Sequence, residues 1–214
     1  MVTAGPTYEP LDDVRRLTNF STGRLGTMLA NYLTQRGHLV TLLIGELATW
    51  PGDRLAQSVK VFSTTADLRA QLKAYSHNRV DVIFHAAAVS DFGFGKMYTR
   101  DAEGNLKACK PSKKIRTCGG SLFVELAPTP KIIAELRDWF PKTKIIGWKF
   151  EADGRRTNAI AAAQRQIVDC KTDFCVANGP AYGKGFSLVT RDGQKHFATA
   201  SDLFFMLEKT TCSL

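Results

Sequence analysis

The sequence predicts an α/β fold in which helices cover both faces of a doubly wound, mostly parallel sheet. Short apolar runs typical of buried strands alternate with segments of helical period along most of the 214 residues. The composition, with 44% hydrophobic and 23% charged residues, is that of an ordinary globular protein. At this length we expect one domain over residues 1–214 rather than two.

The expected elements follow one another in chain order. A strand at 2–4 leads into a long polar loop over 5–20, and Ser21 is expected to cap a helix that ends at Gly37. Thr65 is expected to cap the next helix, and Thr129 with Pro130 to cap and start a third. Further strands are expected at 39–44, 59–62, 80–89, 122–126, 144–148 and 174–177. Helices at 157–170 and 201–209 flank a C-terminal hairpin of residues 186–190 and 195–198.

Residues 93–120 interrupt this pattern. The segment contains glycines and shows no apolar period, so we expect a mobile basic flap without regular structure. Between residues 96 and 118 it carries seven cations and two carboxylates, and therefore five of the net charge of +9. This surplus favours a polyanionic partner, whether a nucleotide, a nucleic acid or an anionic membrane surface.

The cysteines and the chain start restrict the cellular setting. The cysteine count is odd and no C-x-x-C occurs, which indicates reduced thiols rather than disulfides or a zinc site. The start lacks the basic stretch and apolar core of a signal peptide, and the apolar run 80–89 is too short to span a membrane. We therefore expect a cytoplasmic protein without membrane association.

The first strand and the helix after it predict an anion site. Parallel sheets bind ligands at the carboxyl ends of their strands, and a helix N-terminus beginning Ser21-Thr22-Gly23 offers backbone N–H groups to phosphate or carboxylate. About fifteen residues separate Gly5 from this helix, so the tight G-x-G-x-x-G turn of dinucleotide-binding proteins is absent. Simple capping by Ser21 explains the same residues equally well.

Several motifs, in order along nearly the whole chain, resemble those of the phosphopantothenate–cysteine ligase family (phosphopantothenoylcysteine synthetase). In many bacteria this enzyme is the second half of a bifunctional coenzyme A biosynthesis flavoprotein. The opening 2–19 with Ser21 and Gly23 is the longest match. The others are Ala86-Ala87-Ala88-Val89-Ser90-Asp91-Phe92, Lys114-Ile115-Arg116, Thr129-Pro130-Lys131-Ile132, Gly147-Trp148 and Val176-Ala177-Asn178.

The resemblance implies a Rossmann-like fold, a homodimer and a two-step ligation. The substrates would be 4′-phosphopantothenate, L-cysteine and CTP or ATP with Mg²⁺, and the intermediate an acyl-nucleotide. The flavin-binding half has no counterpart here, so no FMN is expected, and a separate flavin-dependent decarboxylase chain would act next. No metal ligands are recognisable in the sequence.

The resemblance also assigns site residues by position. Three residues match the family's catalytic positions. Asn19 would supply an amide donor directed at the intermediate, Arg15 a guanidinium that binds carboxylate or phosphate with two hydrogen bonds, and Lys114 an ammonium on the flap. A loop ion pair with Asp12 or Asp13 is the alternative for Arg15. We expect His85 to be a buried strand histidine rather than a catalytic base. The nucleotide-binding candidates are Gly5, Ser21, Gly23, Ala87, Ala88, Asp91, Thr129, Pro130, Ile132 and Trp148.

The sequence departs from the family at several positions, among them Thr129 in place of an asparagine and Trp148 in place of a phenylalanine. Gln166 and Cys170 stand where the family commonly has helix lysines that bind the triphosphate, and Lys131 replaces an aspartate. These changes leave the choice between CTP and ATP open. Two other functions remain as alternatives: an NAD(P)-dependent oxidoreductase of Rossmann type, and a basic nucleic-acid-binding module.

Overall fold

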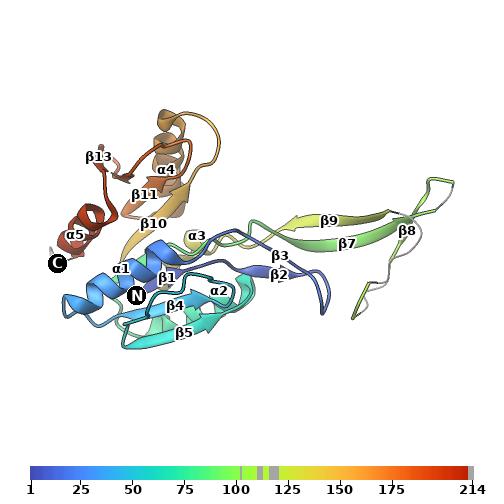
Figure 1. Ribbon diagram of the computed structural model, residues 1–214, viewed down its shortest axis with the longest axis horizontal. Coiled ribbons are helices and arrows are strands. Elements are labelled where there is room, and N and C mark those ends of the chain that lie inside the picture. Colours follow the sequence, from blue (N-terminus) through green and yellow to red (C-terminus); the bar gives the residue numbers. More distant parts are fainter. Residues whose placement is uncertain (102, 110–112, 116–120, 212–214) are drawn as a thin grey trace.

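An eight-stranded sheet forms the body of the molecule, and a narrow antiparallel arm projects from it (Figure 1). The computed structural model describes residues 1–101, 103–109, 113–115 and 121–211. The strand order is β13-β12-β11-β10-β6-β1-β4-β5, with only β12 and β13 antiparallel to their neighbours. The strands are β1 (Val2–Ala4), β4 (Thr41–Gly45), β5 (Ser58–Phe62), β6 (Val82–His85), β10 (Lys144–Phe150), β11 (Phe174–Asn178), β12 (Phe186–Val189) and β13 (Gln194–Phe197).

This order confirms the predicted doubly wound, mostly parallel sheet with a C-terminal hairpin. From β1 in the middle, the chain adds β4 and β5 on one side and then crosses to β6, β10 and β11 on the other. The connections therefore leave β1 and β6 in opposite directions. A crevice at the carboxyl ends of two such strands is the usual ligand site of this architecture.

Helices cover both faces of the sheet because apolar side chains alternate along its strands. Leu42 and Ile44 pack in a cluster with Leu29 of α1 (Arg24–Gln35), whereas Leu43 belongs to the cluster on the opposite face. The first face holds α1 and α5 (Ala200–Thr211). The second holds α2 (Thr65–Ala74), continued by the short 3₁₀ turn Tyr75–His77, α3 (Ile132–Trp139) and α4 (Arg156–Cys170).

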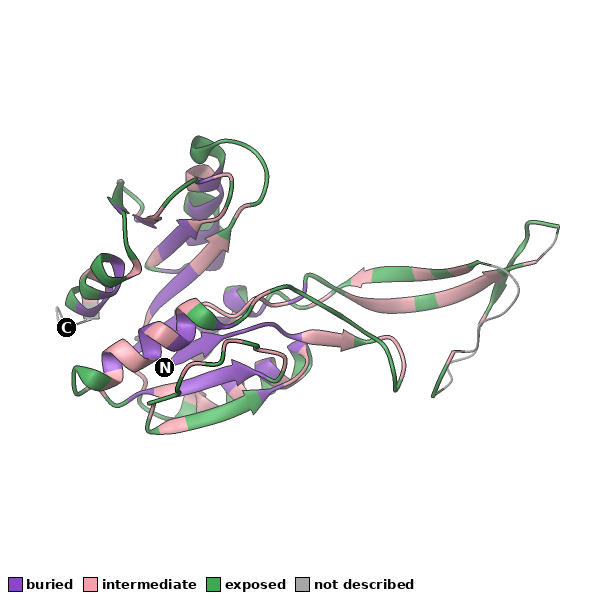
Figure 2. Ribbon diagram, in the orientation of Figure 1, coloured by how far each residue is buried: buried purple, intermediate pink, exposed green. Residues whose placement is uncertain are grey.

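The structure corrects the expectation of an irregular loop over 93–120. Strands β7 (Phe92–Arg100), β8 (Leu106–Ala108) and β9 (Leu122–Pro128) form a three-stranded antiparallel sheet. None of the described residues of these strands is buried, as the absence of purple from the arm shows (Figure 2). Both sides of the arm face solvent, so its strands lack the one-sided alternation that identifies a half-buried strand.

Four further expectations are corrected. The predicted loop over 5–20 contains a hairpin of β2 (Tyr8–Pro10) and β3 (Arg16–Thr18). The N-cap of α1 is Gly23, with φ 76° and no side-chain cap, rather than Ser21. Thr64, not Thr65, caps α2 by accepting from the Asp67 N–H at 3.1 Å. Helix α3 starts after Lys131, because Thr129 is bonded elsewhere.

Candidate active site

The loop of residues 86–91, which follows β6, forms the centre of the candidate site. It lies at the carboxyl ends of β1 and β6, where the sheet connections diverge. The Ala87 N–H donates to Thr3 Oγ1 at 3.1 Å, and the Ala88 N–H donates to the Gly5 carbonyl at 2.9 Å. The Ala88 carbonyl in turn accepts from the Thr7 N–H at 3.1 Å. The predicted pair Ala87 and Ala88 is thus held against the chain that leaves β1.

The second half of this loop is held by threonine side chains. The Ser90 N–H donates to Thr7 Oγ1 at 2.8 Å. Thr129, which follows β9 at the base of the arm, donates its hydroxyl to the Ser90 carbonyl and its N–H to the Asp91 carbonyl, the latter at 3.0 Å. Thr129, a predicted nucleotide ligand, therefore fixes the loop and leaves the exposed Asp91 side chain facing outwards.

Asn19 connects the hairpin to the same loop. Its Nδ2 donates to the Ala88 carbonyl at 3.1 Å and to the Val89 carbonyl at 3.4 Å. Both amide hydrogens are therefore directed at the protein main chain, and no hydrogen bond from the described residues reaches its Oδ1. The structure places the exposed Asn19 against the loop that carries the alanine pair, and its part in catalysis stays a prediction.

The N-terminus of α1 lies beside this loop because two glycines let helix and strand approach closely. Gly5 and Gly23 both have positive φ, and a Cβ on Gly23 would lie 3.3 Å from the Gly5 Cα and 2.9 Å from the Ala48 Cβ. The first turn of α1 contains no carboxylate. Its N–H groups and the positive end of the helix dipole therefore favour an anion at this position. Ser21 is half-buried beside it.

Arg15 lies elsewhere, in the turn between β2 and β3, where the chain contacts residues 113–115 on either side of Lys114. Arg15 forms an ion pair with Asp12 and donates from Nη2 to the Ile115 carbonyl at 2.9 Å, while the Ile115 N–H donates to Asp12 Oδ2 at 3.1 Å. The Arg15 side chain and the Ile115 N–H together hold the pKa of Asp12 well below its ordinary value. The structure thus contains the ion pair that was the alternative for Arg15, and the exposed Lys114 lies beside it.

Two unpartnered polar atoms lie further along the same edge. Trp148 packs on the α1 face of β10, and its Nε1 is buried without a hydrogen-bond partner among the described residues. Asn178 Oδ1, at the end of β11, is buried and equally unpaired. In the register of the two strands Trp148 is opposite Val176, and Asn178 is opposite the exposed Phe150. Sequence reasoning quoted Asn178 in a motif but gave it no role, because strand register is not visible in sequence.

The remaining predicted residues have mixed outcomes. Pro130 is exposed at the base of the arm, but the Ile132 side chain is 1% exposed in the core, so only its main chain could contact a ligand. His85 is buried as expected, and burial lowers its pKa to about 4. Arg116 of the flap motif, Cys118 and Cys212 lie outside the described residues. The described cysteines, Cys109, Cys170 and Cys175, are unpaired thiols.

The departures on α4 have a structural explanation. Gln166 is nearly buried, and a Cβ on Gly147 would lie 2.2 Å from its Nε2, so the Gln166 amide occupies the space above this glycine. Burial raises the pKa of the Cys170 thiol, while the positive charge of the nearby Lys131 ammonium acts in the opposite direction. Lys131 therefore extends from the start of α3 towards the end of α4.

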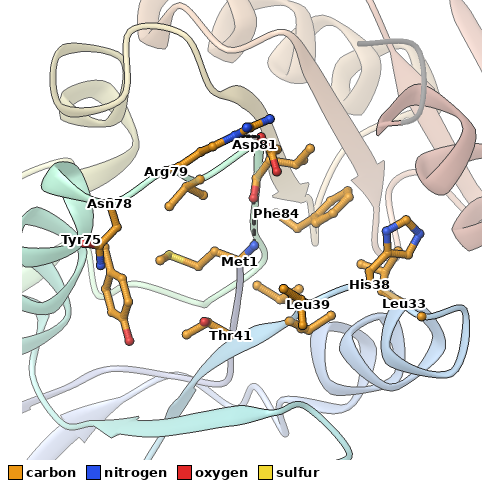
Figure 3. Close-up of a pocket in the computed structure, with 15 residues that line it drawn as sticks. Met1, Leu33, His38, Leu39, Thr41, Tyr75, Asn78, Arg79, Asp81 and Phe84 are labelled. Carbon is orange, nitrogen blue, oxygen red and sulfur yellow. Dashed lines mark hydrogen bonds and ion pairs between the residues drawn. The ribbon is translucent and has the colours of Figure 1, made fainter.

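A cavity of about 790 Å³ lies at the amino ends of the strands, away from this site (Figure 3). Met1 lies at its centre, with the terminal amine donating to the Val82 carbonyl at 2.8 Å, and Leu39 and Phe84 line it together with Arg79. None of the predicted site residues lines this cavity. The candidate site is therefore the carboxyl edge, where the loop, the helix N-terminus and the hairpin converge.

Comparison with known proteins assigns the family. Residues 1–201 match the family described as DNA/pantothenate metabolism flavoprotein C-terminal domain. The chain belongs to this family. A crystal structure of the DNA/pantothenate metabolism flavoprotein from Streptococcus pneumoniae has the same fold, with a TM-score of 0.85 and 26% sequence identity over 100% of this chain and 98% of that chain.

Curated members of the flavoprotein family are longer than this chain. The coenzyme A biosynthesis bifunctional protein CoaBC of Thermococcus kodakarensis is 32% identical over 83% of this chain and 40% of its own length. A protein named cysteine/cysteine sulfinic acid decarboxylase, from an unknown prokaryotic organism, is 32% identical over 78% of this chain and 43% of its own length. The chain thus spans less than half the length of these relatives.

Proposed function

We propose that this protein is a phosphopantothenate–cysteine ligase of coenzyme A biosynthesis. The observation that carries the proposal is the edge of the sheet at the ends of β1 and β6, where a firmly held loop, an α1 N-terminus without acidic residues and Asn19 converge. Membership of a pantothenate-metabolism family and the name of the Thermococcus kodakarensis relative support the same pathway.

The proposed chemistry has two steps. A carboxylate oxygen of 4′-phosphopantothenate bonds to the α-phosphorus of CTP or ATP, and pyrophosphate leaves with the bridging oxygen. The amine of L-cysteine then attacks the acyl carbon, the nucleoside monophosphate leaves with the bonding electron pair, and the amine loses a proton to solvent. Both steps bring anions or developing negative charge together, so cations and aimed donors are what the protein must supply.

The site residues divide these tasks. The α1 N-terminus with Gly5, Ser21 and Gly23 would hold phosphate, and Asn19 would orient the acyl-nucleotide. Trp148 and Asn178, which are half-buried at the ends of β10 and β11, would border the nucleobase. Arg15 and Lys114 would meet the acidic substrate once the hairpin tip and the flap close over the site, which requires the Arg15–Asp12 pair to open.

Mg²⁺ would arrive with the triphosphate. Within the described part of the chain no three His, Cys, Asp or Glu side chains gather as a metal site. Mg²⁺ commonly keeps several waters and binds through substrate phosphates with one or two carboxylates, for which the exposed Asp91 is placed. The proposal includes no FMN.

The test is turnover by the purified protein. With 4′-phosphopantothenate, L-cysteine, Mg²⁺ and CTP or ATP, pyrophosphate and the amide product should appear in equal amounts, and omission of cysteine should leave an acyl-nucleotide detectable by mass spectrometry. Absence of product with every nucleoside triphosphate would refute the ligase proposal. The alternative of an NAD(P)-dependent oxidoreductase has no support from the turn after β1, where a hairpin replaces the tight glycine turn.

We further propose that the protein is a cytoplasmic homodimer that uses the arm as its contact. A three-stranded arm without a buried residue cannot form its own core, and Leu106, Phe123 and Leu126 are exposed on it. Among the described residues no helix is long and apolar enough to cross a membrane. A sedimentation experiment that finds only monomer at micromolar concentration would refute the dimer. A separate flavin-dependent decarboxylase chain remains the proposed consumer of the product.

A further inference from the structure

Two buried threonines beside the crevice have no role in the proposed chemistry, yet both are bonded to the loop of residues 86–91. Thr3 and Thr7 are each 0% exposed. Thr3 lies on β1, and Thr7 follows the Gly5-Pro6 turn after this strand. The first accepts the Ala87 N–H at 3.1 Å, and the second accepts the Ser90 N–H at 2.8 Å. The loop is therefore attached to the chain that leaves β1 in two ways: by backbone hydrogen bonds, with a parallel bridge between Pro6 and Ala88, and by these two side chains.

Each hydroxyl is itself oriented by a second buried group. Thr3 Oγ1 lies 3.0 Å from His85 Nδ1, and burial lowers the pKa of His85 to about 4, so this imidazole is neutral near pH 7. Thr3 Oγ1 can accept the Ala87 N–H and at the same time exchange a hydrogen bond with Nδ1, because a hydroxyl has one donor and two acceptor sites. Thr7 Oγ1 shares a hydrogen bond with Thr65 Oγ1 at 3.2 Å. Thr65 is 2% exposed and starts α2.

We propose that Thr3 and Thr7 are positioning residues, whose hydroxyls hold the main chain of residues 86–91 in the conformation that receives the substrates. This inference rests on the proposed function, because it assumes that the loop contacts them. Neither hydroxyl reaches the crevice itself, since both side chains are buried. Their effect is transmitted through the Ala87 and Ser90 amides, on either side of the Ala88 carbonyl that Asn19 binds.

An isosteric substitution at either position removes the two hydrogen bonds of the hydroxyl and keeps the shape of the side chain. Valine has nearly the shape of threonine but cannot accept the amide hydrogen, whereas serine keeps the hydroxyl and loses a methyl group. Thr143 provides a matched control: it is 6% exposed, and its hydroxyl donates to the Val80 carbonyl at 2.6 Å, near the start of β10 and therefore at the opposite edge of the sheet.

We expect Thr3→Val and Thr7→Val each to lower kcat about 10- to 100-fold, because small misplacements of reacting groups cost about that much. KM for the nucleotide should rise as well, because the displaced loop carries the candidate nucleotide contacts Ala87, Ala88 and Asp91. Thr7→Ser should recover most of the rate. Thr143→Val should keep the wild-type rate although it also loses a buried hydroxyl bond. All rates are compared below the melting temperature of each variant.

Amide hydrogen exchange tests the same inference without turnover. Loss of its hydrogen bond should make the Ser90 amide exchange about tenfold faster in Thr7→Val, and the Ala87 amide should respond in the same way in Thr3→Val. Neither amide should change its exchange rate in Thr143→Val. Unchanged exchange, a rate in Thr7→Val within about threefold of wild type, or an equal loss in Thr143→Val would overturn the positioning role. If the wild-type protein makes no product, the proposed function fails, and the exchange data still decide whether these hydroxyls hold the loop.

Discussion

Asn19 shows what a single side chain does at this site. It is exposed, yet its amide spans two successive carbonyls of the loop after β6, at 3.1 Å and 3.4 Å. An exposed residue held in this way contributes little to stability, because the net value of a hydrogen bond is about 1 kcal/mol. Its value lies in its position, between the hairpin that carries Arg15 and the loop that carries the alanine pair.

We therefore expect Asn19→Ala to fold normally and to lose about 10²- to 10³-fold in kcat, as removal of an aimed donor does. Asn31→Ala is a suitable control, because this α1 residue also bonds a carbonyl, that of Asp53 at 2.7 Å, through its Nδ2. The rate of pyrophosphate release should fall by the same factor in the first variant and stay unchanged in the second. Wild-type turnover in Asn19→Ala would remove this side chain from the mechanism.

The buried His85 predicts a pH dependence of stability. Its pKa is about 4 in the folded protein, against an ordinary value of 6.5, because burial disfavours the charged ring. Between these two pH values the unfolded chain binds a proton that the folded protein does not. The free energy of unfolding therefore rises with pH across this window, and acidification from pH 7 to 4 removes up to about 3 kcal/mol.

This dependence should disappear when residue 85 cannot titrate. His85→Gln keeps an acceptor for the Thr3 hydroxyl, and its urea midpoint should vary less between pH 7 and pH 4.5 than that of the wild type. Equal slopes for the two proteins would contradict the buried neutral histidine. Asp12 affects stability outside this pH window. Because its pKa is lowered in the folded protein, its contribution to the free energy of unfolding is complete above pH 3.8, its ordinary pKa, and is lost only below that pH.

Among the elements, sequence reasoning succeeded best where one face of a strand or helix is buried. Leu42, Leu43 and Ile44 are fully enclosed and identify β4, and the helical period of α1 is equally plain. The arm has no buried described residue: its strand β9 was predicted at 122–126, but β7 and β8 were expected to be loop. The caps of α1 and α3 were also misplaced, because Gly23 and Lys131 begin these helices without a side-chain cap.

The candidate site could be predicted from the sequence only in part. Motifs identified Ala87, Ala88 and Asn19 correctly as neighbours, because loops after adjacent parallel strands meet at one edge. The buried pairings of Thr3 with His85 and Thr7 with Thr65 join residues that are 82 and 58 positions apart. They depend on strand register, which residue types alone do not specify.

The arm should be dispensable for the stability of the body. Phe94 and Leu126 face each other in the register of β7 and β9, so residues 95–125 can be replaced by an Asn-Gly turn. Because the arm contains no buried described residue, the shortened protein should melt within about 5 °C of the wild type. The shortened protein should lose ligase activity, because Lys114 is removed with the arm, and it should sediment as a monomer. A large loss of thermal stability would show that the arm belongs to the body's core.

At the scale of the whole molecule, one apolar cluster joins the beginning and the end of the chain. It extends from Val2 and Leu42 across the sheet to Leu188 of β12 and Leu203 of α5. Helix α1 packs on this cluster through Leu29, while Gly26 brings the same helix against β1: a Cβ there would lie 2.7 Å from the Ala4 Cβ. The stability of the body and the placement of the α1 N-terminus therefore depend on the same contacts.

Leu29→Ala tests this coupling. Leu29 is 0% exposed, so truncation should cost about 2–5 kcal/mol in the free energy of unfolding through lost burial and the cavity left behind. Leu39→Ala is the matched control, because that leucine is 90% exposed and its truncation should change stability by less than about 0.5 kcal/mol. Urea unfolding followed by tryptophan fluorescence and by far-UV circular dichroism should give one coincident transition for both variants. Separate transitions in Leu29→Ala would mean that α1 and β1 unfold independently of the C-terminal strands, and that the cluster does not join the two ends of the chain.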